Sequence, residues 1–153
     1  MILYSRSCAY AIRALTWLAL RRPEGYLLAQ TLGRETGLPR HFLVKILQQL
    51  VRRNLLVSAR GRGGGFALSR PPSQITLLDI VEAIDGVQSV HQCVVGFARC
   101  DEQRPCSQHH RWHPICEQID SFLMYTTLAQ MSDALRRKLN QLEAAAPAEV
   151  VTR

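Results

Sequence analysis

Three cysteines and a histidine stand close together past the middle of the chain, and their residue types suit metal binding. Cys93, Cys100, Cys106 and His109 are spaced C-x6-C-x5-C-x2-H within seventeen residues. Thiolates bind iron and zinc strongly, and one short segment can wrap such a site because its ligands are close in sequence. Charged residues and a proline lie between the last two cysteines, which makes this a poor core segment and disfavours idle buried thiols. The pattern predicts a metal or cluster site.

Zinc and an iron–sulfur cluster are the two rival occupants of this segment. Zinc sites commonly carry a knuckle with about two to four residues between paired cysteines. The gaps of six and five residues do not show it, which favours iron–sulfur. Cys8, on the first predicted helix, is an alternative fourth ligand that would reach a cluster in a second subunit, although a small buried thiol is the simpler interpretation. Three further histidines are alternatives to His109, namely His91, His110 and His113.

Basic residues are concentrated in the first half of the chain. Up to Leu78, twelve arginines and lysines face two acidic residues, whereas the remainder has seven basic and ten acidic residues. The whole chain carries a formal net charge of +7. A basic half joined to a mildly acidic half predicts a polyanion partner for the first half only.

The basic half also contains helical and strand patterns in an informative order. Apolar residues recur at helical spacing, and the third helix has an apolar stripe that includes Phe42. Gly37 suits the end of the second helix, and Pro39 suits the start of the third. Three helices followed by a glycine-tipped hairpin predict a mainly α fold of the winged helix-turn-helix type. The predicted helices cover 7–20, 29–36 and 39–50, and the predicted strands cover 26–28, 55–59 and 66–69.

The third predicted helix and the hairpin tip hold the residues that double-stranded DNA would meet. In a helix-turn-helix, the early residues of the second helix lie nearest the bases in the major groove. Arginine or lysine there reads guanine, at about 1–3 kcal/mol per bidentate contact. Glycines at the tip allow a close backbone approach, and the flanking arginines suit the minor groove. The predicted contact residues are Pro39, Arg40, His41, Val44, Lys45, Arg60, Arg62, Gly63 and Gly64.

The second half is predicted to combine a helix, a loop and a long helix. Thr76 and Asp79 form a capping-box pattern that starts a helix over 77–85. A long helix is expected from His113, with an apolar seam suited to a partner helix from a second copy. The seam residues are Met124, Leu128, Met131, Leu135, Leu139 and Leu142. The expected parts are a DNA-binding domain (1–86), a cysteine-rich loop (87–112), a dimerisation helix (113–143) and a flexible tail (144–153).

Composition excludes several other classes of protein. No run of about 18 apolar residues predicts a membrane span, and the N-terminus lacks the order of a signal peptide, so a cytoplasmic protein is expected. Five cysteines are an odd number, which argues against a closed disulfide framework. No Ser/His/Asp or paired-carboxylate arrangement falls into one pocket, so an enzyme is not expected.

Taken together, the residues resemble the IscR/NsrR/RirA family of winged-helix transcription regulators, the Rrf2 superfamily. The resemblance runs from Leu3 to about Met131 and its motifs are highly specific in combination. The matching motifs are 10–15 (YAIRAL), 38–47 (LPRHFLVKIL), 60–66 (RGRGGGF), 78–81 (LDIV), the loop with Cys93, Cys100 and Cys106, and 127–129 (TLA).

The resemblance implies a homodimer that binds DNA through its winged helices and dimerises through its long C-terminal helix. It also implies that the three cysteines hold an iron–sulfur cluster. In the IscR-like branch, a histidine three residues after the last cysteine completes a 2Fe–2S site, and His109 matches it. In NsrR-like members, a first-helix residue of the other subunit completes a 4Fe–4S site. Here Ala9 occupies that acidic position with Cys8 beside it, so a 2Fe–2S cluster is favoured over 4Fe–4S.

The sequence thus predicts a cluster-sensing, homodimeric DNA-binding regulator, expected to be a repressor that acts on dyad-symmetric operators. The closest alternative is a winged-helix repressor that is stapled by zinc or switched by thiol oxidation. A cluster-bearing electron-transfer protein is a more distant alternative, because it would need neither the arginine-flanked glycine tip nor a helix suited to the major groove.

Overall fold

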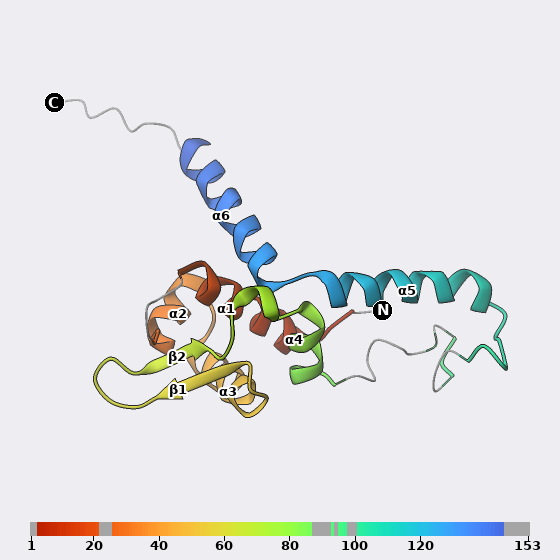
Figure 1. Ribbon diagram of the computed structural model, residues 1–153, viewed down its shortest axis with the longest axis horizontal. Coiled ribbons are helices and arrows are strands. Elements are labelled where there is room, and N and C mark those ends of the chain that lie inside the picture. Colours follow the sequence, from red (N-terminus) through yellow and green to blue (C-terminus); the bar gives the residue numbers. More distant parts are fainter. Residues whose placement is uncertain (1–2, 22–25, 87–92, 94, 98–100, 146–153) are drawn as a thin grey trace.

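The computed structural model describes residues 3–21, 26–86, 93, 95–97 and 101–145. It is mainly helical and has one antiparallel hairpin (Figure 1). In chain order the elements are α1 (Arg6–Arg21), α2 (Ala29–Thr36), α3 (Arg40–Arg52), β1 (Leu56–Ala59), β2 (Gly65–Leu68), the 3-10 turn η1 (Pro72–Gln74), α4 (Leu77–Ile84), α5 (His109–Tyr125) and α6 (Leu128–Ala145). The predicted order of three helices and a hairpin is confirmed. No helix in the described ranges has both the length and the apolar character needed to cross a membrane.

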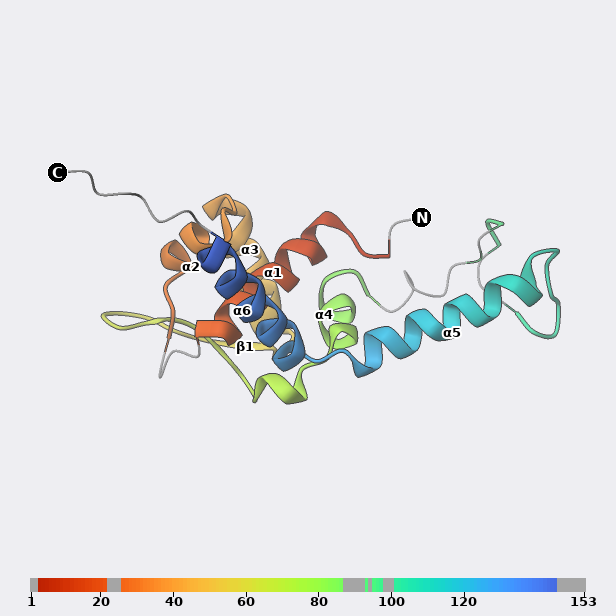
Figure 2. The same cartoon turned by 90° about the horizontal axis from the view of Figure 1, so that it is seen from above.

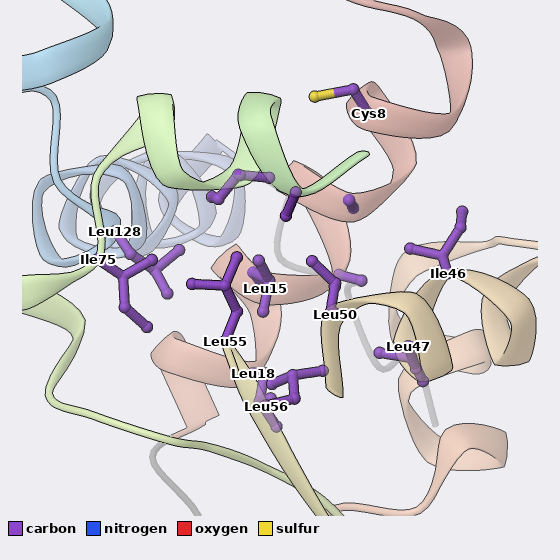
Figure 3. Packing of buried hydrophobic residues seen from close by; sticks show 14 of the residues in the cluster. Cys8, Leu15, Leu18, Ile46, Leu47, Leu50, Leu55, Leu56, Ile75 and Leu128 are labelled. Carbon is purple, nitrogen blue, oxygen red and sulfur yellow. The ribbon is translucent and has the colours of Figure 1, made fainter. Parts of the chain in front are cut away.

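Helix α1 forms the centre of the hydrophobic core. It packs against α2, α3, α4 and α6, so nearly every other helix of the core touches it. Its leucines Leu15 and Leu18 lie opposite Leu47 and Leu50 of α3 in the interior (Figure 3). Fully burying one such side chain contributes about 1.5–3 kcal/mol. The core therefore fixes α3 firmly against α1, and the residues of α3 that point away from α1 include its exposed ones.

The turn between α2 and α3 has the geometry of a helix-turn-helix. Gly37 ends α2 with a φ of 66°, a left-handed conformation that glycine adopts without a steric penalty. The hydroxyl of Thr36 donates to the carbonyl of Leu32 at 2.7 Å. Pro39 precedes α3, and its carbonyl accepts the N–H of Leu43 at 3.0 Å. Both predicted helix boundaries are therefore confirmed to within one residue.

The hairpin has β1 and β2 paired in antiparallel register, with Ala59 opposite Gly65 next to the tip. Leu27 adds an isolated bridge to Phe66, and each of these residues donates its N–H to the other at 2.9 Å. The very short strand expected at 26–28 is thus reduced to this one bridge. The hairpin projects from the helical body in both views (Figures 1 and 2) and forms the wing.

The prediction of one continuous helix over 113–143 is wrong, because the structure has two helices, α5 and α6. Helix α5 begins at His109, so the last four residues of the predicted 87–112 loop are helical. The interruption follows from pairing with the segment before α4. The N–H of Leu77 donates to the carbonyl of Thr126, and the N–H of Leu128 donates to that of Ile75, each at 2.8 Å. These backbone groups are therefore used between elements and not within one helix.

The interruption also changes where the predicted seam points. Leu128 is fully buried and Met131 packs against the core, because α6 lies across α1. Leu142, near the end of α6, is 59% exposed. The middle of the seam therefore packs within the chain itself. Helix α5 extends away from the body in both views (Figures 1 and 2).

Candidate nucleic-acid interface and metal centre

Helix α3 separates its core-facing side chains from its solvent-facing ones. Leu43, Leu47 and Leu50 are fully buried. On the opposite side, Arg40, His41 and Lys45 are exposed, Val44 is half-buried, and Pro39 is exposed just before the helix. The predicted contact residues of α3 therefore form one accessible surface at its amino-terminal end, as groove insertion requires.

Phe42 belongs to this exposed surface, although the sequence placed it in the buried stripe. Its side chain is 51% exposed, and its ring centroid lies 4.4 Å from that of His41. Phe42 is in the first turn of α3, at the margin of the stripe that Leu43 and Leu47 fill. Since an exposed phenylalanine can contact a thymine methyl group, Phe42 is a candidate contact residue that the sequence pattern did not reveal.

Some residues of the wing tip are exposed, and others form its tight turn. Arg60, Arg62 and Gly63 are exposed, whereas Gly64 is buried. A Cβ atom on Gly64 would lie 2.4 Å from the carbonyl oxygen of Ala59, so a side chain does not fit there. The structure thus gives Gly64 a role in closing the tip, while the two arginines reach outward.

Helix α3 and the wing face each other across a groove. A hollow of about 460 Å³ is lined by Gln48 and Arg52 of α3 and by Arg60 and Phe66 of the hairpin. A second hollow, of about 290 Å³, lies between Arg40 and the wing glycines. Six exposed bases lie on α3, at its carboxyl end and at the wing tip, and none of them forms an ion pair with another described residue: Arg40, Lys45, Arg52, Arg53, Arg60 and Arg62. Such a surface attracts a polyanion.

Two of the predicted metal ligands are brought together at the start of α5. The Sγ atoms of Cys93 and Cys106 lie 4.0 Å apart, and Cys93 is buried. Two thiolates that each bind one tetrahedral metal ion at about 2.3 Å stand about 3.8 Å apart, so the pair fits a shared metal. Cys100 and the alternative ligand His91 lie outside the described residues.

Backbone amides favour the thiolate form of Cys93. The N–H of Val95 contributes most to lowering the pKa of this thiol, and the amides of Phe97 and Gly96 and the side chain of Cys106 lower it further, against the opposing effect of burial. The thiolate is the form that ligates metals. Amide donors around sulfur therefore prepare Cys93 for metal binding.

His109 is the histidine placed next to the cysteine pair. It is the first residue of α5, is 7% exposed, and donates its backbone N–H to the carbonyl of Cys106 at 3.0 Å. Of the alternatives, His110 is exposed, and the Nε2 atom of His113 lies 2.8 Å from a carboxylate oxygen of Glu102. Burial beside Cys106 therefore favours His109 over His110 and His113 as the fourth metal ligand.

The other two described cysteines are buried away from solvent. Cys8 is fully buried in the hydrophobic core (Figure 3). Burial, with a further effect from the charge of Asp85, raises the pKa of Cys8 to about 12. Cys116, on α5, is 5% exposed. Within this chain Cys8 therefore packs as a neutral thiol.

The donor set fits a soft metal or cluster, although the described residues alone do not complete it. Among them, no three metal-ligating side chains form one group. The fit rests on the sulfur pair, its amide donors and the buried histidine. In addition, the indole Nε1–H of Trp112, one turn beyond His109, is buried and has no hydrogen-bond partner among the described residues.

Comparison with known sequences identifies the family to which the chain is similar. The Rrf2 profile, described as "Iron-dependent Transcriptional regulator", matches residues 4–134. A helix-turn-helix transcriptional regulator of Aquifex aeolicus is 31% identical over 132 residues, which cover 85% of this chain and 91% of that protein. The regulator IscR of Yersinia pseudotuberculosis is 29% identical over 122 residues, or 80% of this chain and 74% of that protein.

Solved structures share the fold. CymR, the global cysteine regulator of B. subtilis, superposes with a TM-score of 0.75 at 24% identity, covering 88% of this chain and 98% of that one. IscR of T. potens superposes with a TM-score of 0.66 at 24% identity, and the match covers 97% of this chain and 93% of that one. The oxidized form of Staphylococcus aureus CymR superposes with a TM-score of 0.65 at 22% identity, and the match covers 86% of this chain and 96% of that one. The winged-helix prediction is confirmed, and these neighbours are regulators, not enzymes.

Proposed function

Because the chain belongs to the Rrf2 family of iron-dependent transcriptional regulators, we propose that it is a homodimeric repressor that senses its signal through an iron–sulfur cluster. Membership of this family implies DNA binding. The proposed site of action is the cytoplasm, on operators with two half-sites related by dyad symmetry.

The observation that carries the sensing part of the proposal is the sulfur pair of Cys93 and Cys106. Their Sγ atoms lie 4.0 Å apart, and the amide of Val95 lowers the pKa of the Cys93 thiol. Cys100 and His109 would complete the ligand set, in a 2Fe–2S rather than a 4Fe–4S cluster. When bound, such a cluster supplies a centre that oxidants, nitric oxide or iron shortage can alter.

The protein residues have two tasks in this proposal. The thiolates and His109 would hold the cluster, and they would thereby tie the start of α5 to the chain that follows α4. Because a site of this kind does not persist without its metal, the free energy of metal binding becomes local folding free energy. Metal binding is then the event that the DNA-binding domain must detect.

The proposed dimer rests on apolar side chains that α5 leaves exposed. Ile115, Phe122, Met124 and Tyr125 are 45%, 49%, 44% and 75% exposed, on a helix that leaves the body of the chain. Covering these side chains with a second copy would remove them from water. Light scattering should give a dimer with and without DNA, and a monomer in both conditions would contradict this part.

Anaerobic purification tests the cluster directly. The expected protein is coloured and contains iron and acid-labile sulfide in equal amounts, as a 2Fe–2S cluster requires. Stoichiometric zinc without iron or sulfide would contradict the cluster and leave DNA binding standing.

A thiol switch is a second candidate, and the same sulfur pair favours it. A disulfide needs an S–S distance of about 2.05 Å, so a small movement would join Cys93 to Cys106. One fold neighbour is a global cysteine regulator and another was solved in an oxidized form. Peroxide treatment of cluster-free protein would then remove two hydrogens as the two thiols form a disulfide. Mass spectrometry should show a decrease of two mass units that Cys93→Ser abolishes.

A further inference from the structure

The carboxyl end of α4 is held by a side chain of the recognition helix. The Nε2 atom of Gln49 donates to the carbonyl of Ala83 at 3.0 Å and to that of Ile84 at 3.3 Å. The last carbonyls of a helix have no partner within the helix, so a side-chain amide that reaches two of them is an effective cap. Gln49 therefore joins α3 to the last turn of α4.

The same end of α4 is also tied to the start of α1. The carboxylate of Asp85 accepts the backbone N–H of Ser5 at 2.6 Å and its hydroxyl at 2.5 Å. The Ser5 hydroxyl oxygen in turn accepts the N–H of Cys8 at 3.1 Å. Residues 83–85 are thus a junction at which α1, α3 and α4 meet through hydrogen bonds.

This junction, here called the 83–85 junction, stands directly before the cysteine segment. Cys93 follows Gly86 by seven positions. Any restraint that metal binding places on Cys93 reaches α4 along the chain through Gly86 and Asp85. On the other side of the junction, Gln49 belongs to the same rigid helix as Arg40 and Lys45 of the exposed surface.

We propose that Gln49 is a positioning residue that couples the metal state of the cysteine segment to the orientation of α3. This inference rests on the proposed function, in which that metal state sets DNA affinity. Metal binding at Cys93 restrains the chain that follows α4, and the two hydrogen bonds of Gln49 pass that restraint to α3. A coupling of this kind needs a physically connected element, and the hydrogen bonds of the 83–85 junction connect α4 to α3 and to the start of α1.

Gln49 lies outside the predicted DNA-contact residues, so its substitution tests coupling separately from contact. Gln49→Met keeps an unbranched side chain but has no donor. Gln74→Met is the matched control, because Gln74 is exposed on η1 and its described hydrogen bonds use only backbone atoms. Gln49→Lys is the rescue variant, since its ammonium group again donates to the carbonyls at a helix carboxyl end.

The decisive measurement is the ratio of operator dissociation constants between cluster-free and cluster-loaded protein. We expect Gln49→Met to bring this ratio about threefold to tenfold closer to one, the effect of removing one or two hydrogen bonds. The visible absorbance and the dimeric state of Gln49→Met should be the same as those of the wild type. Hydrogen exchange gives a second readout: loading should slow exchange in α3 of the wild type and of Gln74→Met, but not in α3 of Gln49→Met.

The outcomes separate the inference from the proposed function. A wild-type ratio of one would contradict the proposed function itself. If the wild-type ratio differs from one and Gln49→Met keeps it, or if Gln74→Met reduces it equally, the role of Gln49 is refuted. If Gln49→Met does not fold, Gln49→Ala is used instead: a ratio brought closer to one in folded protein, with the wild-type ratio kept in Gln49→Lys, supports the coupling, and an unchanged ratio in Gln49→Ala overturns it.

Discussion

The backbone N–H of Leu77 donates to the carbonyl oxygen of Thr126 at 2.8 Å and so joins the first turn of α4 to the break between α5 and α6. The two residues are far apart in sequence. Their bond determines where α5 ends, and therefore which leucines of the C-terminal region turn inward. The first prediction tests this assignment.

Leu128→Ala should destabilise the chain by about 2–5 kcal/mol, because Leu128 is fully buried and its removal leaves a cavity. Leu142→Ala, at a residue that is 59% exposed, should change the unfolding free energy by less than about 0.5 kcal/mol. Urea denaturation at two protein concentrations measures both. Equal destabilisation by the two variants would show that the middle of the seam does not belong to the core of the chain.

Arg60→Ala and Arg62→Ala should weaken binding to operator and random DNA alike, and each should lower the salt slope by about 1. The reason is that both side chains extend from the wing tip without an ion pair among the described residues. Titration by fluorescence anisotropy at several salt concentrations measures this. Arg136→Ala, on α6, is the control and should leave the salt slope unchanged.

Arg40→Ala and Lys45→Ala should in addition relax base preference, at about 1–3 kcal/mol for each base-reading side chain that is removed. Both residues are exposed in the amino-terminal half of α3. The measurement is the ratio of affinities for the operator and for a duplex with single base changes. If this ratio is unchanged in both variants, α3 is not the reading helix.

Alanine at Cys93, Cys100 or Cys106 should abolish the visible absorbance of anaerobically prepared protein, because each removes a thiolate ligand. His109→Ala should shift or destabilise the absorbance without abolishing it. Cys8→Ala should keep the wild-type spectrum, since Cys8 lies in the core. A spectrum abolished in Cys8→Ala and kept in His109→Ala would transfer the fourth position from His109 to Cys8.

Cys8 and Cys93 should differ in their response to pH and to alkylation. Burial raises the pKa of Cys8 from 9.0 to about 12, so the folded protein holds this proton more tightly than the unfolded chain does. The resulting stabilisation is complete below about pH 9 and is lost as the pH rises towards 12. Cys8→Ala should therefore flatten the fall in unfolding free energy across that range.

Cys8 and Cys93 should also differ in how fast they are alkylated. Because backbone amides lower the pKa of Cys93, iodoacetamide at pH 7.5 should modify Cys93 in metal-free protein well before Cys8. Peptide mass spectrometry over time gives the order of modification. Faster alkylation of Cys8 would contradict its placement in the core.

Local sequence rules predicted the helix-turn-helix well. Gly37 and Pro39 act through backbone conformation within one or two residues, so their effect does not depend on the remainder of the fold. The capping box of Thr76 and Asp79 is likewise local, and both of its hydrogen bonds are present. Such signals are read from the sequence because the partners are neighbours.

The features that were missed depend on partners distant in sequence. The break at Thr126 follows from pairing with 75–77, about fifty positions earlier, and helical spacing alone cannot reveal it. Phe42 has the residue type and spacing of the stripe, yet its place in the first turn leaves it uncovered. For the cysteines, spacing predicted the candidate ligands, but only the three-dimensional structure places Cys93 beside Cys106.

Helix α5 is attached to the body at one end, near Thr126, and carries His109 at the other. Its 17 residues span about 25 Å. It is therefore a lever whose pivot is the pairing with the segment before α4. A rotation of about 5° at that pivot moves the far end by about 2 Å, comparable to a metal–sulfur bond length. Small rotations at that pivot are thus magnified at His109, and a metal held by His109 and the cysteines would restrict the orientation of α5.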